Sequence, residues 1–392
     1  MTDNASHLAF ALPDIGEEEI QEVVNCLRSG WLTTGHIAAQ FEKDFAAAIG
    51  AKYAAAVNSA TAGLHLALEA IGIEPGDKVL TTPYTFTASA EVIRYLGADP
   101  LFVDIESDTF NLSPELVESA FQRRPEGIKA ILPVHLAGQS CPMDRLLAIA
   151  GEHGVRVVED AAHALPATFQ GRNIGTLGDA TVFSFYATKP LATGEGGMVT
   201  TDSEDIFKRI KIMRLHGISR DIWDRYTADK PNWYYEVVAP GFKYNMPDII
   251  AAIGIHQLKK TERFHKRRKE IAEAYDQAFA DLPLTLPHVR DRNDVHAWHL
   301  YVIKLDLVKL SITRDVFIEK MAKLGVGTSV HFIPLHLHPY WRDRYGLKPG
   351  DFPVASDCFQ RVVSLPIYPK MTGQDVDKVI SAVRKVVLEN FR

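Results

Sequence analysis

From about residue 52 onward, short apolar β-type runs alternate with helical stretches, and this alternation restricts the possible folds more than any other feature of the sequence. The runs are YAAAV, KVLTT, LFVDI, KAILPVH, VRVVED, TVFSF and GMVTT, with stretches such as GLHLALEAIG and SPELVESAFQ between them. Strands that alternate with helices form βαβ units, in which helices cover both faces of a largely parallel sheet. We therefore expect an α/β fold.

The length of 392 residues is too great for one ordinary hydrophobic core, so two domains are expected. Near Pro247 the pattern changes, and DIIAAIGIHQLKKTERFHKRRKEIAEAYDQAFA carries a helical periodicity that would give a rod roughly 50 Å long if unbroken. Beyond it, the runs YVIKL and GTSVHFIP and two helical stretches predict α+β structure. We predict a large domain over 1–248, which begins with an N-terminal helix, and a small domain over 249–392 entered through the long helix.

Composition and charge exclude several classes of protein. Hydrophobic residues make up 46% of the chain and charged residues 23%, which is typical of a soluble globular protein. The net charge of -6, without a block of lysines and arginines, argues against a nucleic-acid surface. No leader-like N-terminus and no run of ~20 apolar residues is present, so we expect a cytoplasmic protein without a membrane span. Cys26, Cys141 and Cys358 lack the spacing of a disulfide framework or a zinc site.

The stretch SFYATKPLATGEGG places Lys189 between a strand-like run and a group of glycines. Pro190 disfavours the α conformation for the residue before it, so Lys189 is expected in a turn or an extended segment. Gly194 and Gly196 permit positive φ and a close approach of other groups to the main chain. The pattern therefore predicts a lysine that is presented by a loop, the alternative being an ordinary solvated lysine.

Asp160 ends the apolar run VRVVED. Ligands of open α/β sheets bind beyond the carboxyl ends of the strands, where such an acid would meet them. The alternative is that Asp160 only caps the next helix. A presented lysine together with a strand-terminal carboxylate is what pyridoxal phosphate requires, because the amine forms a Schiff base and the carboxylate keeps the pyridine nitrogen protonated.

Hydroxyl groups stand where the phosphate of such a cofactor would bind. Ser59, Ala60 and Thr61 precede the apolar helix of NSATAGLHLALEA, and a helix N-terminus offers unpaired N–H groups to an anion. Ser184, five residues before Lys189, is a second hydroxyl candidate. Each of these residues alone could be a simple cap, but together they fit a phosphate site.

Six segments resemble the DegT/DnrJ-type sugar aminotransferases, a fold type I pyridoxal-phosphate family. They are VNSATAGLHLAL, TTPYTFTASAEVIRYLGADPLFVDI, PVHLAGQSCPMD, VVEDAAHALPATFQGRNIGTLGDATVFSFYATKPLATGEGGMVTT, GFKYNMPDIIAAIGIHQLKK and VVSLPIYP. The resemblance extends over nearly the whole chain, with the motifs in order. It implies a large domain with a mostly parallel seven-stranded sheet, a smaller α+β C-terminal domain, and pyridoxal 5'-phosphate with a pyridoxamine phosphate form in the cycle.

The resemblance also implies roles for individual residues. Lys189 matches the Schiff-base lysine and Asp160 the partner of the pyridine nitrogen. Phe86 matches the aromatic side chain that stacks on the cofactor ring, the alternative being a core phenylalanine. His163 stands beside the ring hydroxyl, where many relatives carry glutamine, and a histidine adds a titratable group. The matching phosphate contacts are Thr61, Ser184 and the amide of Ala62, with Ser59 in the same segment.

A homodimer with shared active sites is part of this expectation. Asn245, in KYNMPD, matches a segment that reaches into the neighbouring subunit's site. Many relatives carry asparagine two residues earlier, where this chain has Lys243, so the residue that touches the phosphate is left open. The residues that resemble the surroundings of the sugar are Trp31, Leu32, Thr33 and His331.

The expected reaction moves an amino group from L-glutamate to a nucleotide-linked keto-sugar, at C4. Alternatives are a C3 keto-sugar or cyclitol aminotransferase, and a non-catalytic nucleotide-sugar-binding regulator. Lys189 argues against the related sugar dehydratases, in which histidine replaces the lysine. The sequence marks no arginine as dedicated to the donor carboxylate, and Arg220 is named only as a candidate. The loop that holds it, with Trp223 and Trp233, is either a stacking lid or a packing loop.

The run VHFIPLHLHPYW contains His331, His336 and His338, which suggests a metal site. No carboxylate or cysteine stands at suitable local spacing to complete one. We therefore expect no metal and assign these histidines to the polar lining of the substrate cleft.

Overall fold

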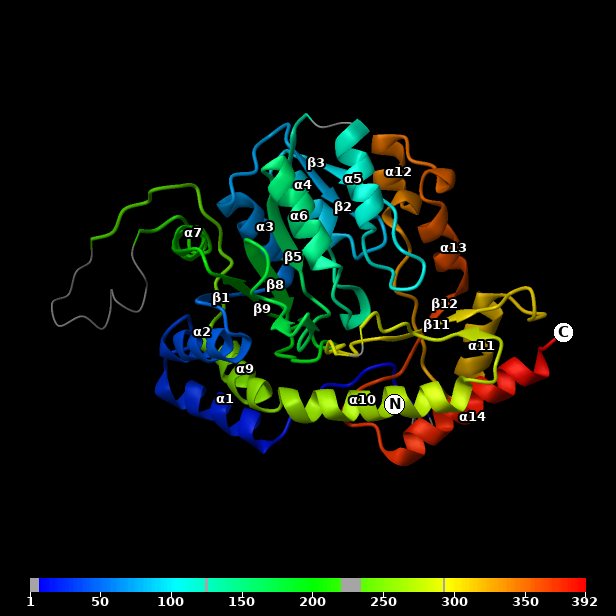
Figure 1. Cartoon of the computed structure of the whole chain (residues 1–392). Coiled ribbons are helices and arrows are strands. Elements are labelled where there is room, and N and C mark those ends of the chain that lie inside the picture. Colours follow the sequence, from blue (N-terminus) through cyan, green and yellow to red (C-terminus); the bar gives the residue numbers. More distant parts are fainter. Residues whose placement is uncertain (1–6, 124–125, 220–233, 292) are drawn as a thin grey trace.

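The structure is a computed structural model that describes residues 7–123, 126–219, 234–291 and 293–392. At its centre is a seven-stranded sheet in the order β1-β9-β8-β5-β4-β2-β3 (Figure 1). Strands β8, β5, β4, β2 and β3 pair in parallel, and β9 is antiparallel to both of its neighbours. The predicted α/β fold with a mostly parallel sheet is confirmed. The strands are β1 (Tyr53–Val57), β2 (Lys78–Thr81), β3 (Asp99–Phe102), β4 (Ile128–Ile131), β5 (Arg156–Asp160), β8 (Ala180–Ser184) and β9 (Gly197–Thr201).

Helices cover both faces of this sheet because successive side chains of a strand point to opposite sides. In β1, Ala54 and Ala56 pack in the same cluster as Phe41, whereas Ala55 and Val57 pack in the same cluster as Leu64. The first face is covered by α2 (His36–Ile49), α5 (Pro114–Arg123), α6 (Met143–His153) and α9 (Asp248–Lys259), with α1 (Glu17–Ser29) against α9. The second face is covered by α3 (Ala60–Ala70), α4 (Ala88–Tyr95) and α7 (Glu204–Met213).

The long helical pattern after Pro247 forms two helices instead of one rod. Helix α9 ends at Lys259 and α10 (Thr261–Phe279) begins two residues later, with Lys260 between them at φ -94°. Ala251 and Ala252 of α9 lie in the cluster of the large sheet, whereas Ile271 of α10 lies in a C-terminal cluster. The break lets each helix bury its apolar residues against a different core. The predicted boundary at residue 248 stays a prediction.

The C-terminal part contains a three-stranded antiparallel sheet, in the order β10-β11-β12, packed against α10, α11 and α14. The run GTSVHFIP, predicted as a strand, contributes only the bridge between Ser329 and Ser364. The elements are β10 (Leu284–Thr285), β11 (Tyr301–Leu305), α11 (Arg314–Lys323), α12 (Pro339–Tyr345), α13 (Pro353–Arg361), β12 (Val362–Leu365) and α14 (Gly373–Glu389). Shorter elements are η1 (Leu136–Gly138), β6 (Thr168–Phe169), β7 (Arg172–Asn173), η2 (Leu335–Leu337) and η3 (Pro349–Asp351).

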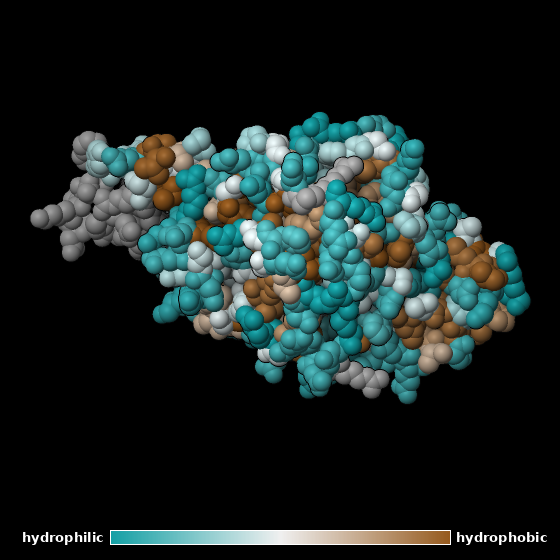
Figure 2. Space-filling view, turned by 45° about the horizontal axis from the view of Figure 1, so that its top comes forward, coloured by the Kyte–Doolittle hydropathy of each residue, from teal (hydrophilic) through white to brown (hydrophobic). Residues whose placement is uncertain are grey.

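The surface is largely polar on the face that Figure 2 presents, where hydrophobic residues are scattered among hydrophilic ones. Across the described ranges, no helix combines the length and the apolar character that crossing a bilayer would require. The three cysteines, Cys26, Cys141 and Cys358, are all buried.

Candidate active site

A cavity of about 470 Å³ lies beyond the carboxyl ends of β5 and β8. This is the edge of a parallel sheet at which ligands bind. Eight of the residues singled out in the sequence line it, although they come from five separate segments of the chain. They are Ser59, Thr61, Phe86, Asp160, His163, Ser184, Lys189 and His331.

Lys189 is presented to the cavity by a tight loop between β8 and β9. The main-chain N–H of Lys189 donates to the Tyr186 carbonyl at 2.8 Å. Gly196, at φ 156°, is required here because a Cβ would stand 2.6 Å from Thr193 Oγ1. Burial lowers the pKa of Lys189 to about 8, and the charge of Asp160 opposes this effect. The loop therefore offers an amine that loses its proton at a lower pH than an ordinary lysine does.

Asp160 ends β5, and its carboxylate is held by two donors. Ser89 Oγ donates to Oδ2 at 2.7 Å, and the Ala162 N–H donates to Oδ1 at 3.0 Å. The Ser89 hydroxyl also contacts Thr85 Oγ1 at 2.8 Å. Asp160 thus binds the chain that follows it, as a cap would, and lines the cavity as well. Ser89 was missed in the sequence because it lies 71 positions from Asp160 and nothing in the local pattern marks it.

The N-terminus of α3 forms another part of the cavity wall. Ser59 is the N-cap, and its Oγ accepts a 3.1 Å hydrogen bond from the Ala62 N–H. Ala60 and Thr61, in the first turn, line the cavity. Ser184 Oγ accepts from the Tyr186 N–H at 3.3 Å. A helix N-terminus flanked by hydroxyl groups is suited to an anion.

Three imidazoles line the same cavity, those of His163, His299 and His331. His163 Nδ1 accepts a 3.3 Å hydrogen bond from the Ala137 N–H, and His331 Nδ1 bonds to Ser364 Oγ at 2.8 Å. Burial and the nearby Lys189 lower the pKa of His331 to about 4. Burial, Lys189 and His331 likewise hold the pKa of His163 well below its ordinary value. These side chains are therefore neutral near pH 7.

Phe86 is 58% exposed although it is a large apolar side chain. Its ring lies 5.9 Å from that of Phe332, which also lines the cavity. This exposure contradicts the alternative of a core phenylalanine. It leaves a flat apolar surface at the cavity that a planar ligand can cover.

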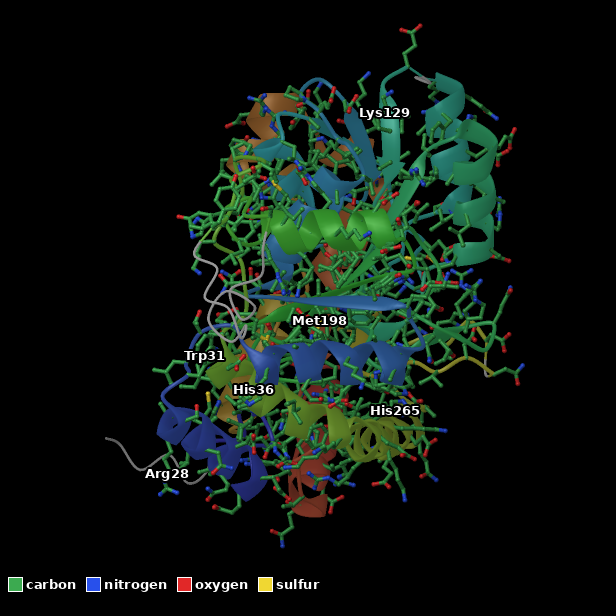
Figure 3. All side chains as sticks on the ribbon, turned by 90° about the vertical axis from the view of Figure 1, so that its left-hand side faces the viewer. Arg28, Trp31, His36, Lys129, Met198 and His265 are labelled. Atoms are coloured by element: carbon green, nitrogen blue, oxygen red, sulfur yellow. The ribbon has the colours of Figure 1, made fainter. Side chains whose placement is uncertain are left out.

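Five other predicted site residues lie away from this cavity within the single chain. Asn245 Nδ2 donates to Thr34 Oγ1 at 2.6 Å, and Trp31 Nε1 donates to the Thr34 carbonyl at 3.3 Å. Figure 3 shows Trp31 on the connection between α1 and α2, close to the start of α2 at His36. Leu32 and Thr33 belong to the same connection, and the Lys243 carbonyl accepts from Asn58 Nδ2. Their predicted role in a neighbouring subunit's site stays a prediction.

The remaining candidates have other surroundings. His336 is buried and bonds to Ser356 Oγ at 2.9 Å, and His338 immediately precedes α12. Among the residues with described positions, no three histidine, cysteine or acidic side chains are grouped to hold a metal ion. Arg220, Trp223 and Trp233 lie outside the described residues.

Comparisons with known proteins agree with the sequence resemblance. The model of the DegT/DnrJ/EryC1/StrS aminotransferase family matches residues 13–384. The spore coat polysaccharide biosynthesis protein SpsC of Bacillus subtilis is 52% identical over 390 residues, which cover 99% of each protein. An uncharacterized protein of Methanocaldococcus jannaschii is 53% identical over 378 residues, or 96% of this chain and 97% of the relative.

Solved structures show the same fold. A putative sugar aminotransferase of Streptococcus pneumoniae in its PMP form has a TM-score of 0.91 and 33% identity, and the match covers 97% of this chain and 99% of that one. An aminotransferase of Helicobacter pylori involved in pseudoaminic acid biosynthesis has a TM-score of 0.89 and 28% identity, with 98% and 100% covered. The predicted fold type I architecture is confirmed. From these matches and from the lysine, carboxylate and helix N-terminus gathered at one cavity, we conclude that the chain belongs to the DegT/DnrJ/EryC1/StrS aminotransferase family.

Proposed function

We propose that the protein is a pyridoxal-phosphate-dependent aminotransferase that moves the amino group of L-glutamate to a nucleotide-linked keto-sugar, at C4. One observation carries this proposal: Lys189, whose pKa is lowered to about 8, opens onto the same cavity as the buried carboxylate of Asp160. The cofactor, when bound, supplies the electron sink that transamination requires.

The residues present fit this cofactor. Lys189 would hold its aldehyde carbon, and Asp160 would face the ring nitrogen. The exposed ring of Phe86 would cover one face, and the Nε2 side of His163 would meet the ring oxygen. The phosphate would lie at the N-terminus of α3, near the hydroxyls of Ser59, Thr61 and Ser184 and the amide of Ala62.

Each group then has a task in the reaction. Lys189 would hold the cofactor covalently and, once released as a neutral amine, would move the proton of the donor Cα. Asp160, oriented by Ser89 and the Ala162 amide, would face the ring nitrogen. Lys189 would make the reverse proton transfers as the amine passes to the keto carbon of the sugar, whose oxygen leaves as water. The donor leaves as 2-oxoglutarate, which takes its keto oxygen from water.

We propose further that the enzyme is a cytoplasmic homodimer. Trp31, Leu32, Thr33 and Asn245 lie outside their own chain's cavity, which supports a role for them in the partner's site. Either Asn245 or Lys243 would reach the partner's phosphate group. The likeness to the spore coat polysaccharide biosynthesis protein of Bacillus subtilis supports a place in polysaccharide biosynthesis.

The decisive experiment follows the amino group. The protein, loaded with pyridoxal phosphate, is incubated with ¹⁵N-labelled L-glutamate and a panel of UDP-, TDP- and GDP-linked 4-keto and 3-keto sugars, and mass spectrometry reads the label in the products. Labelled 4-amino sugar supports the proposal, and the Lys189→Ala variant is the control. Label at C3 would move the assignment to the C3 alternative. Nucleotide-sugar binding by a protein that takes up no pyridoxal phosphate would show a regulator instead.

A further inference from the structure

The imidazoles of His163 and His299 form a packed pair beside Lys189. Their ring centroids are 4.3 Å apart and their planes are tilted by 47°. Both residues line the cavity, and each is only 5% exposed. His299 Nδ1 is buried and has no hydrogen-bond partner. Because His299 Nδ1 makes no hydrogen bond, the His299 ring contacts the His163 ring chiefly through van der Waals packing.

The orientation of His163 is fixed by its hydrogen bond to the main chain. Because Nδ1 accepts from the Ala137 N–H, the proton of the neutral imidazole is on Nε2. Only Nε2 is left to meet a ligand, and it does so as a donor. A glutamine side chain at this position would offer the same kind of donor.

Ala137 also joins His163 to the segment that carries His299. The Leu300 N–H donates to the Ala137 carbonyl at 3.2 Å, and the Ala297 N–H donates to the Gly138 carbonyl at 2.8 Å. Gly138 adopts φ 104°, and a Cβ on it would stand 2.9 Å from Ala297 Cβ and 3.0 Å from the His163 carbonyl. Only glycine permits this approach. The contact between residues 137–138 and 297–300, called the junction below, therefore holds the two histidines together.

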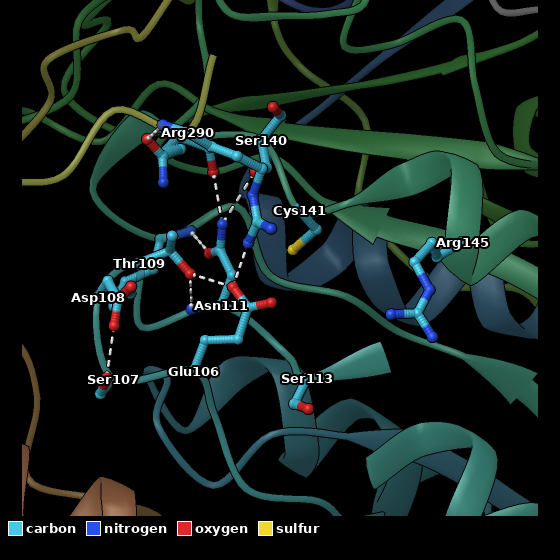
Figure 4. Close-up of polar contacts among 12 residues, drawn as sticks. Glu106, Ser107, Asp108, Thr109, Asn111, Ser113, Ser140, Cys141, Arg145 and Arg290 are labelled. Carbon is cyan, nitrogen blue, oxygen red and sulfur yellow. Dashed lines mark hydrogen bonds and ion pairs between the residues drawn. The ribbon is translucent and has the colours of Figure 1, made fainter. Parts of the chain in front are cut away.

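Buried side chains support the junction from both sides. Arg268 Nη1 donates to the carbonyls of Trp298 and His299, at 3.2 and 3.3 Å. Asn111 holds the other segment, residues 136–140. Its Oδ1 accepts from the Leu136 N–H at 3.0 Å, and its Nδ2 donates to the carbonyls of Gln139 and Ser140 (Figure 4). The pair therefore belongs to a rigid assembly.

We propose that His299 is a positioning residue that packs against the His163 imidazole and keeps its Nε2–H directed at the ring oxygen of the cofactor. This inference rests on the proposed function. The titratable groups that line the cavity with His163 are Asp160, Tyr186, Lys189, Glu195, His299 and His331, and a charge on Lys189 or on a neighbouring imidazole opposes charging of His299. Burial, Lys189 and His331 hold the pKa of His163 well below its ordinary value, so the ring that His299 packs against is a neutral donor near pH 7.

The test uses the full-length protein and two readouts besides activity: the dissociation constant for pyridoxal phosphate, and the pH midpoint of the visible absorbance of the bound cofactor. His299→Ala removes the ring, and His299→Phe keeps a flat ring without titratable nitrogens. We expect His299→Ala to weaken cofactor binding about tenfold and to move the midpoint by about one pH unit, as when an orienting neighbour of a ligand-binding side chain is lost. His299→Phe should stay within about twofold of wild type in affinity.

A double-mutant cycle separates positioning from a general structural effect. In a His163→Gln background, His299→Ala should no longer move the midpoint, because a residue that acts through His163 has no further effect once that imidazole is gone. If His299→Ala proves unstable on heating, His299→Leu, which fills volume without a flat ring, takes its place.

Three results would overturn the inference: a wild-type affinity and midpoint in His299→Ala, an equal defect in His299→Phe, or an undiminished effect in the His163→Gln background. These differ from a failure of the proposed function, in which the wild-type protein itself would take up no pyridoxal phosphate.

Discussion

The Ser89 hydroxyl donates a 2.7 Å hydrogen bond to Asp160 Oδ2, and Ser89 is completely buried. The carboxylate at the end of β5 is therefore oriented by α4, a helix that lies between β2 and β3 in the sequence. Because hydrogen bonds to charged groups are stronger than neutral ones, this contact ties the placement of Asp160 to the packing of α4.

Ser89→Ala should weaken binding of pyridoxal phosphate about tenfold, since a hydrogen bond to a charged group contributes roughly 1.5–3 kcal/mol. Equilibrium titration of the apoprotein with the cofactor measures the effect. Ser113→Ala is the matched control, because Ser113 Oγ accepts from the Leu116 N–H at the start of α5, and its loss should lower the free energy of unfolding by about 1 kcal/mol without changing cofactor affinity. Equal affinities in Ser89→Ala and wild type would contradict this role.

Lys189→Ala should abolish amino transfer, because it removes the group that binds the cofactor covalently and moves the proton. General acid–base contributions of ~10²–10⁴-fold set the lower limit of the loss. Borohydride treatment of the wild-type holoenzyme followed by peptide mass spectrometry should place the label on Lys189. The control is Lys129→Ala, on the exposed side of β4, which should retain full turnover. Covalent label at another lysine would be incompatible with the assignment.

The rate of cofactor capture by the apoprotein should rise with pH and level off above about 8, the pKa to which burial lowers Lys189. Only the neutral amine attacks an aldehyde, so each pH unit below this value should slow capture about tenfold. Asp160 raises the pKa of Lys189, so Asp160→Asn should move the midpoint to lower pH. Stopped-flow absorbance measures the profile. A midpoint near the ordinary lysine value of 10.5 would contradict the burial of this amine.

The same shift affects stability. The folded state holds the Lys189 proton less tightly than the unfolded state, so the free energy of unfolding of the apoprotein should rise between pH 8 and 10.5. Lys189→Met should remove this rise. Urea titrations at several pH values compare the two proteins, and parallel pH profiles would show that the amine is not desolvated.

Sequence patterns could predict the parts of the site that local chemistry determines. The neighbouring residues predict the positions of three site residues: Lys189 stands before a proline, Asp160 ends an apolar run, and Ser59 precedes an apolar helix. All three line the cavity. Ser89 and His299 could not be found in this way, because their contacts with Asp160 and His163 depend on how distant segments pack.

The same limit explains the errors in the elements. The helical periodicity after Pro247 continues through Lys260. The helix nevertheless ends at Lys259 and a new one begins at Thr261, because α9 and α10 pack against different cores. The run GTSVHFIP has β-type residues, yet apart from one bridge at Ser329 it forms no ladder in the part of the chain described. Periodicity reports which residues are apolar and not which core receives them.

Gly138→Ala should disrupt the junction between 137–138 and 297–300. The added Cβ would meet Ala297 Cβ at 2.9 Å, and the backbone at φ 104° disfavours any side chain. We expect a loss of about 1–3 kcal/mol in the free energy of unfolding, the usual effect of overpacking, together with weaker cofactor binding. Gly151→Ala, inside α6 with nothing within 4 Å of its Cβ, should be neutral or stabilising. Similar stabilities for the two variants would contradict the predicted clash.

Phe86→Ala should weaken cofactor binding without destabilising the apoprotein. The side chain is 58% exposed, so its removal leaves no cavity in the core. A ring that covers one face of the cofactor contributes roughly 0.5–1.5 kcal/mol beyond the area it buries, so we expect an affinity loss of about tenfold. Titration with pyridoxal phosphate measures the affinity, and thermal unfolding with and without the cofactor measures the stability.

Two further variants make this test specific to stacking. Phe86→Tyr keeps a flat ring and should bind the cofactor as wild type does. Leu116→Ala removes a 40% exposed apolar side chain from α5, away from the cavity, and should change neither measurement. If Phe86→Ala lowers the melting temperature of the apoprotein but leaves the affinity unchanged, the ring packs against the protein instead of the cofactor. The position of this exposed ring, at the cavity and beside Phe332, lets a ligand that enters the cavity cover it.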